Sequence, residues 1–371
     1  MNKNQKIIGI IHELTMGGAE RMMVNILNHF ASKEEDVHLV IFKNIGSLKV
    51  LLNKNIKVHD LESNSVKKGM PLCLKVLFGL KPDTVFSGIG HVNIALAPFI
   101  PLMKKMLPQT KWIARETNIV SLQNQESKYP KLFDFLYRQT YGNFDVIIAQ
   151  SEDMKSDLET NYPKSSSKIV LINNPIDIEK VQKLSEEKIA FPFDEKTINL
   201  ITVGTLRQKK RHDLLLKSFA LLAQNYRLII VGSGEEEANL KVLCLELKIE
   251  NRVVLAGHQT NPYPYMKHAD MFLLTSEHEG FPNVLLEANS VGTAIVSFSC
   301  PGGIEEIIEE GLNGFTVPNG DVEALAEKLR NIENIKLNSE EIIDSVQRRF
   351  AQNIILKKYE NIFYSQEVKH G

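Results

Sequence analysis

The sequence predicts an α/β protein built from two doubly wound parallel-sheet domains. Short apolar runs rich in β-branched residues alternate with helical patterns along most of the chain. Because these runs are continuous in apolar character, they predict strands covered by helices on both faces, as in a parallel sheet. The 371 residues exceed the length of one typical domain, and the alternation occurs in two separate series.

The first series of predicted strands begins near the N-terminus. Helical patterns stand between most of its strands, and residues 19–31 are an example. The predicted strands are residues 6–11, 37–42, 83–87, 111–114, 145–149 and 168–172. This series predicts an N-terminal Rossmann-like domain in residues 1–175.

A polar, proline-containing stretch of weak periodicity follows and predicts a linker at residues 176–197. The second series predicts a Rossmann-like domain at 198–345, and residues 346–371 predict a C-terminal helix that packs back on the first domain. Its strands are residues 198–204, 226–232, 252–257, 270–275 and 294–298. Ligands bind beyond the carboxyl ends of such strands, so two such domains predict a ligand site in a cleft between them.

The composition excludes several classes of protein. A net charge of −1 gives no overall attraction for nucleic acid, and 43% hydrophobic residues suffice for two cores. Cys73, Cys244 and Cys300 form neither a metal-type spacing nor a disulfide framework, which predicts a reducing, cytoplasmic compartment. The apolar run at 7–11 is too short for a signal peptide or a membrane span.

Two turns that follow predicted strands suit anion binding. In TMGGAE (15–20), Gly17 and Gly18 would let backbone N–H groups approach an anion at a helix start, although a tight turn has the same sequence. GTLRQKKRHD (204–213) places four bases where a helix begins. Cations there oppose the helix dipole, so the bases favour a bound anion, with a solvated basic turn as the alternative.

The stretch SEHEGFPNVLLEANS (276–290) holds two glutamates, Glu279 and Glu287, with seven residues between them. Glu287 lies within an apolar helical pattern, where an unpaired charge is costly. Pro282 suits the first turn of a helix, and the free N–H groups of that turn would receive a phosphate. Carboxylates accept strong hydrogen bonds from hydroxyls, so the two glutamates suit a sugar and a ribose flanking a diphosphate.

Three further motifs contain glycine. VGSGEEEANL (231–240) lacks the third glycine of a dinucleotide fingerprint and predicts a close backbone approach or a turn. PGG (301–303) opens a predicted helix after the strand at 294–298, and GLNGF (311–315) predicts a structural turn.

With GGAER near the start, the motifs SEHEGFPNVLLEA, CPGGIEEII and GLNGFTVPNGD resemble those of retaining glycosyltransferases of family 4, over essentially the whole chain. The resemblance implies the GT-B fold and a nucleotide-sugar donor, of which UDP-linked sugars are the commonest. It implies that Glu279 lies by the transferred sugar, that Glu287 binds the ribose hydroxyls and that Lys210 contacts the diphosphate. The remaining donor-binding residues would be Gly17, Gly18, Gly204, Thr205, Gly280, Phe281, Asn283 and Val284.

The chain departs from the family pattern at two positions. Thr205 stands where the G-R-L-x-x-x-K element has arginine, and we expect Arg207 to contact the same phosphate from the next turn. Thr117 stands where many relatives have the histidine of E-H-S, although ARETN (114–118) matches an R-E-x-N version found in other members. The resemblance implies that the domain at 1–175 binds the acceptor and that the domain at 198–345 binds the nucleotide sugar. The residues expected on the acceptor side are His91, Glu116, Thr117 and Asn118.

The resemblance also implies a mechanism. The sugar would be transferred on one face with retention, and the leaving phosphate would accept the acceptor's proton. Glu279, Lys210 and Arg207 are the expected catalytic residues, and the two cations and the helix-tip amides would stabilise charge on the diphosphate by preorganised electrostatics. No Asp-x-Asp element stands at a predicted strand end, so we expect no metal and no cofactor beyond the nucleotide-sugar co-substrate.

The basic segment 51–111, with nine Lys or Arg residues and three acids, bears on the acceptor. Two stretches, 65–81 and 91–111, combine apolar residues with lysines, which suits an anionic membrane surface. The lysines are Lys67, Lys68, Lys75, Lys104 and Lys105. Two ordinary core-facing helices with solvated lysines are the alternative. The membrane interpretation predicts transfer of a hexose or N-acetylhexosamine to a lipid-linked saccharide, for a bacterial polysaccharide or lipopolysaccharide, at the inner face of the cytoplasmic membrane.

Other functions remain open at this point. They are transfer to a soluble acceptor, a nucleotide-sugar epimerase of similar fold, and a non-catalytic GT-B scaffold subunit. The intact Glu279, Lys210 and Glu287 argue against a scaffold, and the missing G-x-G-x-x-G argues against a dinucleotide oxidoreductase. The sequence leaves open which sugar is transferred, the linkage formed and the oligomeric state.

Overall fold

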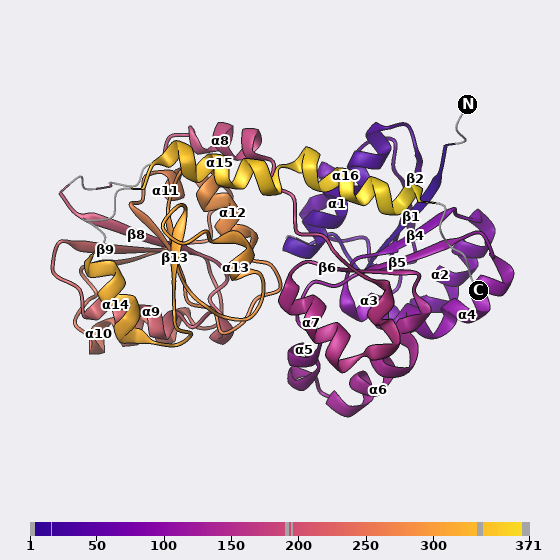
Figure 1. The fold of residues 1–371 in the computed structure, drawn as a ribbon, viewed down its shortest axis with the longest axis horizontal. Coiled ribbons are helices and arrows are strands. Elements are labelled where there is room, and N and C mark those ends of the chain that lie inside the picture. The colour runs from indigo at the N-terminus through magenta and orange to yellow at the C-terminus, as the bar shows by residue number, and fades with distance from the viewer. Residues whose placement is uncertain (1–3, 16, 190–192, 194–195, 332–336, 366–371) are drawn as a thin grey trace. The chain divides into compact units, whose positions relative to one another are not determined.

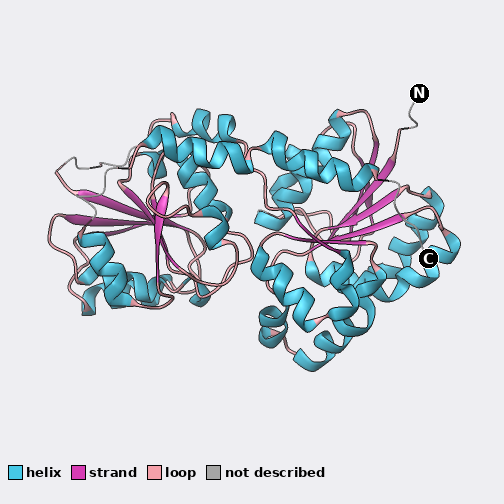
Figure 2. Cartoon of the chain, viewed as in Figure 1, coloured by secondary structure: helices cyan, strands magenta, loops and turns pink. Residues whose placement is uncertain are grey.

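The computed structural model describes residues 4–15, 17–189, 193, 196–331 and 337–365. The chain forms two compact units, Met1–Asn174 with Ile355–Gly371, and Pro175–Ile354. In each unit the strands lie in the centre and the helices lie outside them (Figures 1 and 2). The prediction of two α/β domains with parallel sheets is therefore confirmed, and each unit is described by itself below.

The first unit contains a seven-stranded sheet of order β3-β2-β1-β4-β5-β6-β7, with every pair parallel. Its strands are β1 (Lys6–Ile11), β2 (Asp36–Ile41), β3 (Lys57–Asp60), β4 (Thr84–Ser87), β5 (Lys111–Arg115), β6 (Val146–Ala149) and β7 (Ile169–Leu171). The sequence predicts all of these except β3. Because β3 is a short edge strand whose residues are mostly exposed, it has no apolar run to reveal it.

The helices of the first unit cover both faces of this sheet (Figure 1). They are α1 (Gly18–Ser32), α2 (Val66–Leu80), α3 (Gly90–Leu96), α4 (Ile100–Met106), α5 (Val120–Glu126), α6 (Pro130–Thr140), α7 (Glu152–Asn161) and the greater part of α16 (Gln352–Tyr364), with 3-10 turns η1 (Ser47–Leu51), η2 (Ala97–Phe99), η3 (Tyr141–Asn143) and η4 (Pro163–Lys168). Helices α1 and α16 lie side by side, with the rings of Phe30 and Phe363 stacked at 4.4 Å between centroids. The end of the chain thereby contributes to the core of the first unit.

The second unit contains a six-stranded parallel sheet of order β10-β9-β8-β11-β12-β13. Its strands are β8 (Ile198–Val203), β9 (Tyr226–Val231), β10 (Val253–Gly257), β11 (Met271–Leu274), β12 (Ile295–Phe298) and β13 (Gly314–Val317). The sequence predicts the first five. Strand β13 is missed because its four residues begin inside GLNGF, which has the composition of a turn.

Helices again cover both faces of the second sheet. Figure 1 shows α8, α11, α12 and α15 on one face and α9, α10 and α14 on the other, and a separate apolar core lies on each face. The helices are α8 (Ile178–Ser185), α9 (His212–Ala220), α10 (Glu237–Glu246), α11 (Tyr263–Lys267), α12 (Asn283–Ser290), α13 (Ile304–Ile307), α14 (Val322–Arg330) and α15 (Ser339–Phe350), with the 3-10 turn η5 (Gln208–Lys210).

The predicted linker at 176–197 is wrong for the residues that form α8. The Asp177 side chain caps this helix by accepting a hydrogen bond from the Lys180 backbone N–H at 3.1 Å. Ile178 and Val181 are buried in the core that α8 shares with α11 and α12. A helix of eight residues with so short an apolar face is not evident from periodicity. Residues 190–192 and 194–195 of the predicted linker lie outside the described residues.

The prediction of one C-terminal helix over 346–371 is also wrong. Helix α15 ends at Phe350 and α16 begins at Gln352, because the backbone of Ile176 intervenes. The Ile176 N–H donates to the Phe350 carbonyl at 2.9 Å, and the Gln352 N–H donates to the Ile176 carbonyl at 3.0 Å. This pairing holds Ala351 in an extended conformation and interrupts the helix. Residues 366–371 lie outside the described residues.

Candidate functional site

Three loops with candidate donor-binding residues follow three adjacent strands of the second unit. Strands β8, β11 and β12 are neighbours in the sheet. The carboxyl ends of parallel strands meet at one edge, so the loops 204–211, 275–282 and 299–303 converge there. The GTLRQKKR, SEHEGFP and PGG motifs, which lie far apart in the sequence, thus belong to one site.

Lys210 and Glu279 form an ion pair at this edge. The Lys210 Nζ lies 2.5 Å from Glu279 Oε1, and the Ser276 hydroxyl donates to the same oxygen at 2.6 Å. The two charged side chains are only 20% and 14% exposed, so water screens the pair less than it would an exposed pair. The structure therefore brings together two of the three predicted catalytic residues, and Ser276 adds a contact that the sequence did not predict.

Backbone hydrogen bonds hold the three loops against one another. The Glu277 N–H donates to the Lys209 carbonyl at 2.8 Å, and the Thr275 hydroxyl donates to the Lys210 carbonyl at 3.1 Å. The Glu279 N–H donates to the Pro301 carbonyl at 2.9 Å. Because Thr275 is buried and these bonds run between loops, the positions of Lys210 and Glu279 are set by the backbone.

Gly302 permits the closest approach between two of these loops. Its φ of +113° lies in a region that side chains disfavour, and a Cβ atom there would lie 1.9 Å from the Glu279 carbonyl oxygen. No larger residue fits without moving the Glu279 backbone. The PGG motif thus supports the loop that carries Glu279.

Helix α12 begins between the two glutamates of the E-x7-E element. Pro282 precedes the helix as its N-cap, one residue earlier than the first-turn position that the sequence predicts. Glu287 lies one turn into the helix, half-buried, with its Oε1 at 3.5 Å from the Tyr263 hydroxyl. The predicted contact residues between the glutamates divide into buried Gly280 and Phe281 and half-buried Asn283 and Val284, the first two residues of the helix.

In the basic turn after β8, the side chains of Lys210 and Arg207 have different surroundings. A Cβ atom on Gly204 would lie 4.0 Å from Lys210 Cε, so Gly204 lies beside the lysine stem. Thr205 and Arg207 are exposed. Arg207 lines a polar cavity of about 640 Å³, and the rest of its lining includes Arg211, Asp213, Asn239 and Glu277. The Lys210 backbone N–H donates to the Arg207 carbonyl at 3.0 Å. Among the described residues, no side-chain hydrogen bond or ion pair links Arg207 to Lys210 or Glu279, so its role on the diphosphate stays a prediction.

The VGSG motif supports this turn from the neighbouring strand β9. The Leu206 N–H donates to the Ser233 carbonyl at 3.0 Å. Gly232 has φ +151°, and a Cβ atom there would lie 1.8 Å from the Gly204 carbonyl oxygen. The predicted close backbone approach is therefore confirmed.

In the first unit, three candidate residues follow the adjacent strands β1, β4 and β5. His12 follows β1, His91 lies in the first turn of α3 after β4, and Glu116 follows β5. The rings of His12 and His91 meet edge to face at 5.3 Å between centroids. Partial burial lowers the pKa of His91, and His12 adds to the effect. The sequence predicted His91 and missed His12, whose position directly after a strand was the available signal.

Glu116 is fully buried and belongs to the interior of the first unit. Its Oε1 accepts hydrogen bonds from the Tyr141 hydroxyl, from Asn93 Nδ2 at 3.1 Å and from the Tyr137 hydroxyl at 3.4 Å. Burial raises the pKa of this carboxyl, and the three donors oppose that effect. Thr117 and Asn118, which follow Glu116, are half-buried, and the role of these three residues on the acceptor side stays a prediction.

The two predicted anion-binding glycines, Gly17 and Gly18, also lie in the first unit. Gly17 is the N-cap of α1, and Gly18 is the first residue of that helix. They are thus at a helix start after β1, as the sequence predicts, and their contact with a donor stays a prediction.

The stretches predicted to meet a membrane form α2 and the segment from α3 to α4. Lys104 is not available for lipid headgroups, because its Nζ forms an ion pair with Asp145 at 2.5 Å and bonds the Asn143 carbonyl. The lysines Lys67, Lys68, Lys75 and Lys105 are exposed. The exposed apolar side chains of α2, η2 and α4 are Leu72, Phe78, Phe99, Leu102 and Met106, which we call the apolar surface. Among the described residues, no helix has the length and apolar character needed to cross a membrane.

Comparison with known proteins identifies both halves of the chain. Residues 16–180 match the family model described as Glycosyltransferase Family 4, and residues 185–350 match the model described as Glycosyl transferases group 1. An N-acetyl-alpha-D-glucosaminyl L-malate synthase of Bacillus anthracis is 30% identical, over 96% of each chain. An N-acetylgalactosaminyltransferase of Campylobacter jejuni, named for a diphospho-undecaprenol substrate, is 29% identical over 84% of this chain and 86% of its own.

Solved structures share the fold. The lipopolysaccharide outer core galactosyltransferase WaaB is 22% identical with a TM-score of 0.77, over 97% of this chain and 99% of its own. The Anabaena protein HepE, in complex with UDP, is 19% identical with a TM-score of 0.78, over 96% of this chain and 99% of its own. Together with the two family matches, these findings show that the chain belongs to glycosyltransferase family 4 and has the GT-B fold.

Proposed function

We propose that this glycosyltransferase transfers a hexose or N-acetylhexosamine from a UDP-linked sugar to a lipid-linked saccharide, with retention at the anomeric carbon. The transfer would serve the synthesis of a bacterial surface glycan. The donor would bind where β8, β11 and β12 end in the second unit.

The Lys210–Glu279 ion pair is the observation that supports this proposal most strongly. If Glu279 forms hydrogen bonds with the sugar hydroxyls, the ammonium group of Lys210 requires another negative charge beside it. The diphosphate of the donor would supply that charge. The diphosphate would thus replace Glu279 as the ion-pair partner of Lys210. Glu279, still hydrogen-bonded to the Ser276 hydroxyl, would accept hydrogen bonds from the sugar. Both groups are already fixed by the backbone bonds of their loops, which is the preorganisation that stabilises charge in a transition state.

The identity of the nucleotide is supported by the likeness to HepE, whose structure contains UDP. Glu287, half-buried one turn inside α12, is suited to the ribose hydroxyls. Neither role requires a metal ion, and we propose that the reaction proceeds without one. Turnover that survives removal of divalent cations with a chelator would support this, and restoration of lost turnover by added Mg²⁺ would contradict it.

The lipid-linked acceptor is supported by two observations. The Campylobacter relative acts, by its name, on a saccharide carried by diphospho-undecaprenol. The apolar surface and its neighbouring lysines provide contacts for an anionic bilayer, where such acceptors reside. On this basis the protein would work at the inner face of the cytoplasmic membrane.

Transfer to a small soluble acceptor is a second candidate. It is favoured by the relative from Bacillus anthracis, which by its name forms a glucosaminyl malate and which aligns over 96% of this chain. The two candidates share the donor site and differ in the first unit only.

A two-step assay tests the proposed function. The first step titrates the protein with UDP, GDP and ADP in a thermal-shift measurement, and we expect stabilisation by UDP to exceed that by the others. The second step incubates the protein with a panel of UDP-sugars and either a prenyl-diphosphate-linked saccharide or malate. Product from the lipid-linked acceptor alone is the expected result. Product from malate alone would favour the second candidate, and the absence of any nucleotide binding would overturn both.

A further inference from the structure

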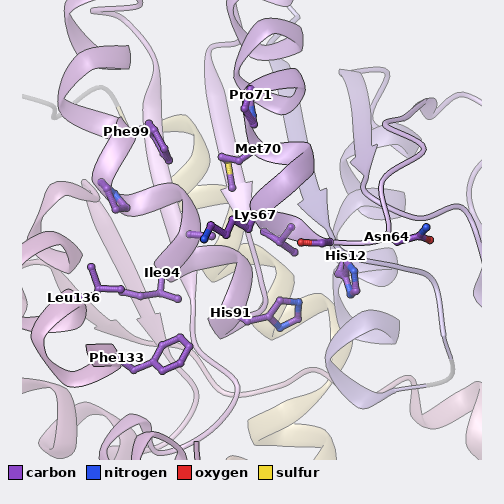
Figure 3. A pocket seen from close by; sticks show the side chains of 14 residues that line it. His12, Asn64, Lys67, Met70, Pro71, His91, Ile94, Phe99, Phe133 and Leu136 are labelled. Carbon is purple, nitrogen blue, oxygen red and sulfur yellow. The ribbon is translucent and has the colours of Figure 1, made fainter. Parts of the chain in front are cut away.

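An apolar cavity of about 740 Å³ lies in the first unit among α2, α3, η2 and α6. Figure 3 shows its lining side chains. Most of the lining is apolar and includes Val66, Met70, Pro71, Ile94, Ala95, Pro98, Phe99, Phe133 and Leu136. Protein interiors are otherwise close-packed, so a cavity of this size with an apolar wall is suited to an apolar ligand.

The polar residues of the cavity are few, and two are the histidines already described. His12 and His91 lie side by side in Figure 3, and Lys67 extends from α2 among the apolar side chains. His12 Nε2 is buried, and no described residue lies within hydrogen-bonding reach of it. A buried donor or acceptor without a partner is costly, which indicates that a ligand group completes its bonding.

The positive charge near the cavity favours a negatively charged ligand group. The ammonium of Lys67 lines the cavity, and exposed Lys68 follows on the same helix. The segment 51–111, which supplies most of the lining, contains nine basic and three acidic residues. An anionic group is therefore favoured at the polar residues, next to an apolar chain along the remaining wall.

The mouth of the cavity adjoins the apolar surface. Phe99 belongs to both, since it lines the cavity and is 40% exposed. Leu72 directly follows the lining residue Pro71, and Leu102 lies one helical turn beyond Phe99. The shared residue Phe99 and these neighbours suit a hydrocarbon chain that enters the cavity from a bilayer.

We propose that this cavity binds the isoprene units next to the diphosphate of a polyprenyl-diphosphate-linked acceptor, and that Lys67, His12 and His91 contact the diphosphate. The inference rests on the proposed lipid-linked acceptor and specifies where that lipid is held. The cavity would set the depth at which the diphosphate stops, and the saccharide beyond it would extend toward solvent.

A chain-length series tests the apolar part of this proposal. The probes are inorganic diphosphate and geranyl, farnesyl and geranylgeranyl diphosphate, titrated calorimetrically into the full chain below the concentration at which they form micelles. Each isoprene unit that enters the cavity should strengthen binding by about tenfold or more, because each buried methylene contributes substantially. Equal affinity for all four probes would overturn the proposal.

Two matched phenylalanine variants locate the binding. Phe99→Ala removes a ring from the cavity wall, whereas Phe135→Ala removes an exposed ring of α6 that is not part of the lining. We expect Phe99→Ala to lower the affinity for farnesyl diphosphate about tenfold and to leave the affinity for inorganic diphosphate unchanged, because the substitution removes apolar contacts only. Phe135→Ala should change neither. Equal effects of the two variants on farnesyl diphosphate would place the chain outside the cavity.

A second pair tests the anion contact. Lys67→Ala should lower the affinities for inorganic diphosphate and for every prenyl diphosphate by a similar factor. Lys131→Ala, at an exposed position of α6, should lower none of these affinities. Ala95→Trp, which fills the cavity, should abolish the dependence on chain length. Urea unfolding followed by the fluorescence of Trp112, the chain's one tryptophan and a buried residue of the first unit, reports whether each variant is folded. A cavity-filled variant that is folded and retains the chain-length dependence would overturn the proposal.

The outcomes separate this inference from the proposed function. If UDP and a UDP-sugar bind and a sugar is transferred to a chain-free saccharide, while prenyl diphosphates do not bind, the cavity inference fails and the transferase activity stands. If no nucleotide binds, the proposed function fails irrespective of the cavity.

Discussion

Lys210 and Glu279 are paired at 2.5 Å although 68 residues separate them in the chain. Their loops follow neighbouring strands, β8 and β11, and the Ser276 hydroxyl bonds the same carboxylate oxygen as the lysine. The pair keeps each charge compensated in the donor-free protein. On the proposed function, we expect an incoming diphosphate to replace Glu279 as the partner of Lys210 without movement of either backbone.

The first prediction concerns the charge on Lys210. Lys210→Ala should lower the turnover number by about 100-fold or more, because one preorganised donor to a developing oxyanion contributes about that much. The measurement is the initial rate of UDP release from the UDP-sugar in the presence of acceptor. Lys209→Ala is the matched control, since Lys209 contributes its backbone carbonyl to the Glu277 N–H and the substitution preserves that carbonyl. A loss below fivefold for Lys210→Ala would remove this lysine from the mechanism.

The second prediction concerns Glu287 and the ribose. In the wild-type protein, UDP should bind more tightly than 2′,3′-dideoxy-UDP by about tenfold or more, since hydrogen bonds to a charged group contribute about 1.5–3 kcal/mol. Glu287→Ala should make the two affinities equal. Glu305→Ala changes an exposed glutamate of α13 and should preserve the difference. Calorimetric titration checks this, and an unchanged preference in Glu287→Ala would show that another group reads the ribose.

The third prediction concerns the loop beneath Glu279. Gly302→Ala places a Cβ atom 1.9 Å from the Glu279 carbonyl oxygen, so the loop must move. We expect a loss of stability of at least about 1–3 kcal/mol from the backbone strain alone, together with weaker UDP-sugar binding. Gly311→Ala is the control, because Gly311 has φ +75° and a Cβ there would have no neighbour within 4 Å. Denaturant unfolding and titration of both variants test the claim. Similar UDP-sugar affinity in the two variants would contradict it.

The fourth prediction concerns Glu360, which joins α16 to α1 in the first unit. Burial acts to raise the pKa of this carboxyl, but hydrogen bonds from Lys33, His29 and Lys357 lower it from 4.5 to about 2. A folded-state pKa below the unfolded value gives stability that is fully present above about pH 4.5 and is lost as the pH falls through 2. Because Lys33 and Lys357 are largely exposed, water screens these contacts, and their contribution to stability is on the order of 1 kcal/mol.

Glu360→Gln should therefore be less stable than the wild type at pH 7 by an amount of that order, and the difference should shrink between pH 5 and pH 2. Glu62→Gln, at an exposed position before α2, should show no pH-dependent difference. Urea unfolding over this pH range provides the test. A difference that is independent of pH would show that the ion pairs do not carry the effect.

The fifth prediction concerns the apolar surface. The protein should sediment with vesicles that contain anionic lipid at low salt and should be released as the ionic strength rises, because screening weakens the contribution of the exposed lysines. Leu102→Glu should reduce sedimentation severalfold. Val50→Glu changes an even more exposed apolar residue on η1 and should have little effect. Equal binding of both variants would place the membrane contact elsewhere.

Most of the fold follows from the sequence, because buried parallel strands such as β1 and β12 are continuous apolar runs. The exceptions are elements without that signal. Strand β3 is exposed, β13 begins in a glycine turn, and α8 buries so few side chains that it resembles a linker. Their formation depends on tertiary contacts that no local pattern records.

The candidate site was predicted in part. The sequence identified Lys210, Glu279 and Glu287 as separate residues, from the motifs that contain them and from the resemblance to family 4. Their partners could not be predicted, because the contact of Ser276 with Glu279, the contact of Tyr263 with Glu287 and the meeting of His12 with His91 depend on the order of the strands. Glu116 was assigned to the acceptor side, a role that stays a prediction, and its full burial could not be predicted from the sequence.

The most direct test of the exchange at the Lys210–Glu279 pair compares the affinities of UDP and UMP by calorimetry, in the wild type and in Lys210→Ala. The wild type should prefer UDP, because the second phosphate replaces Glu279 at the ammonium group. Lys210→Ala should bind UDP and UMP with similar affinity. A preference for UDP that is retained in full by Lys210→Ala would contradict the account.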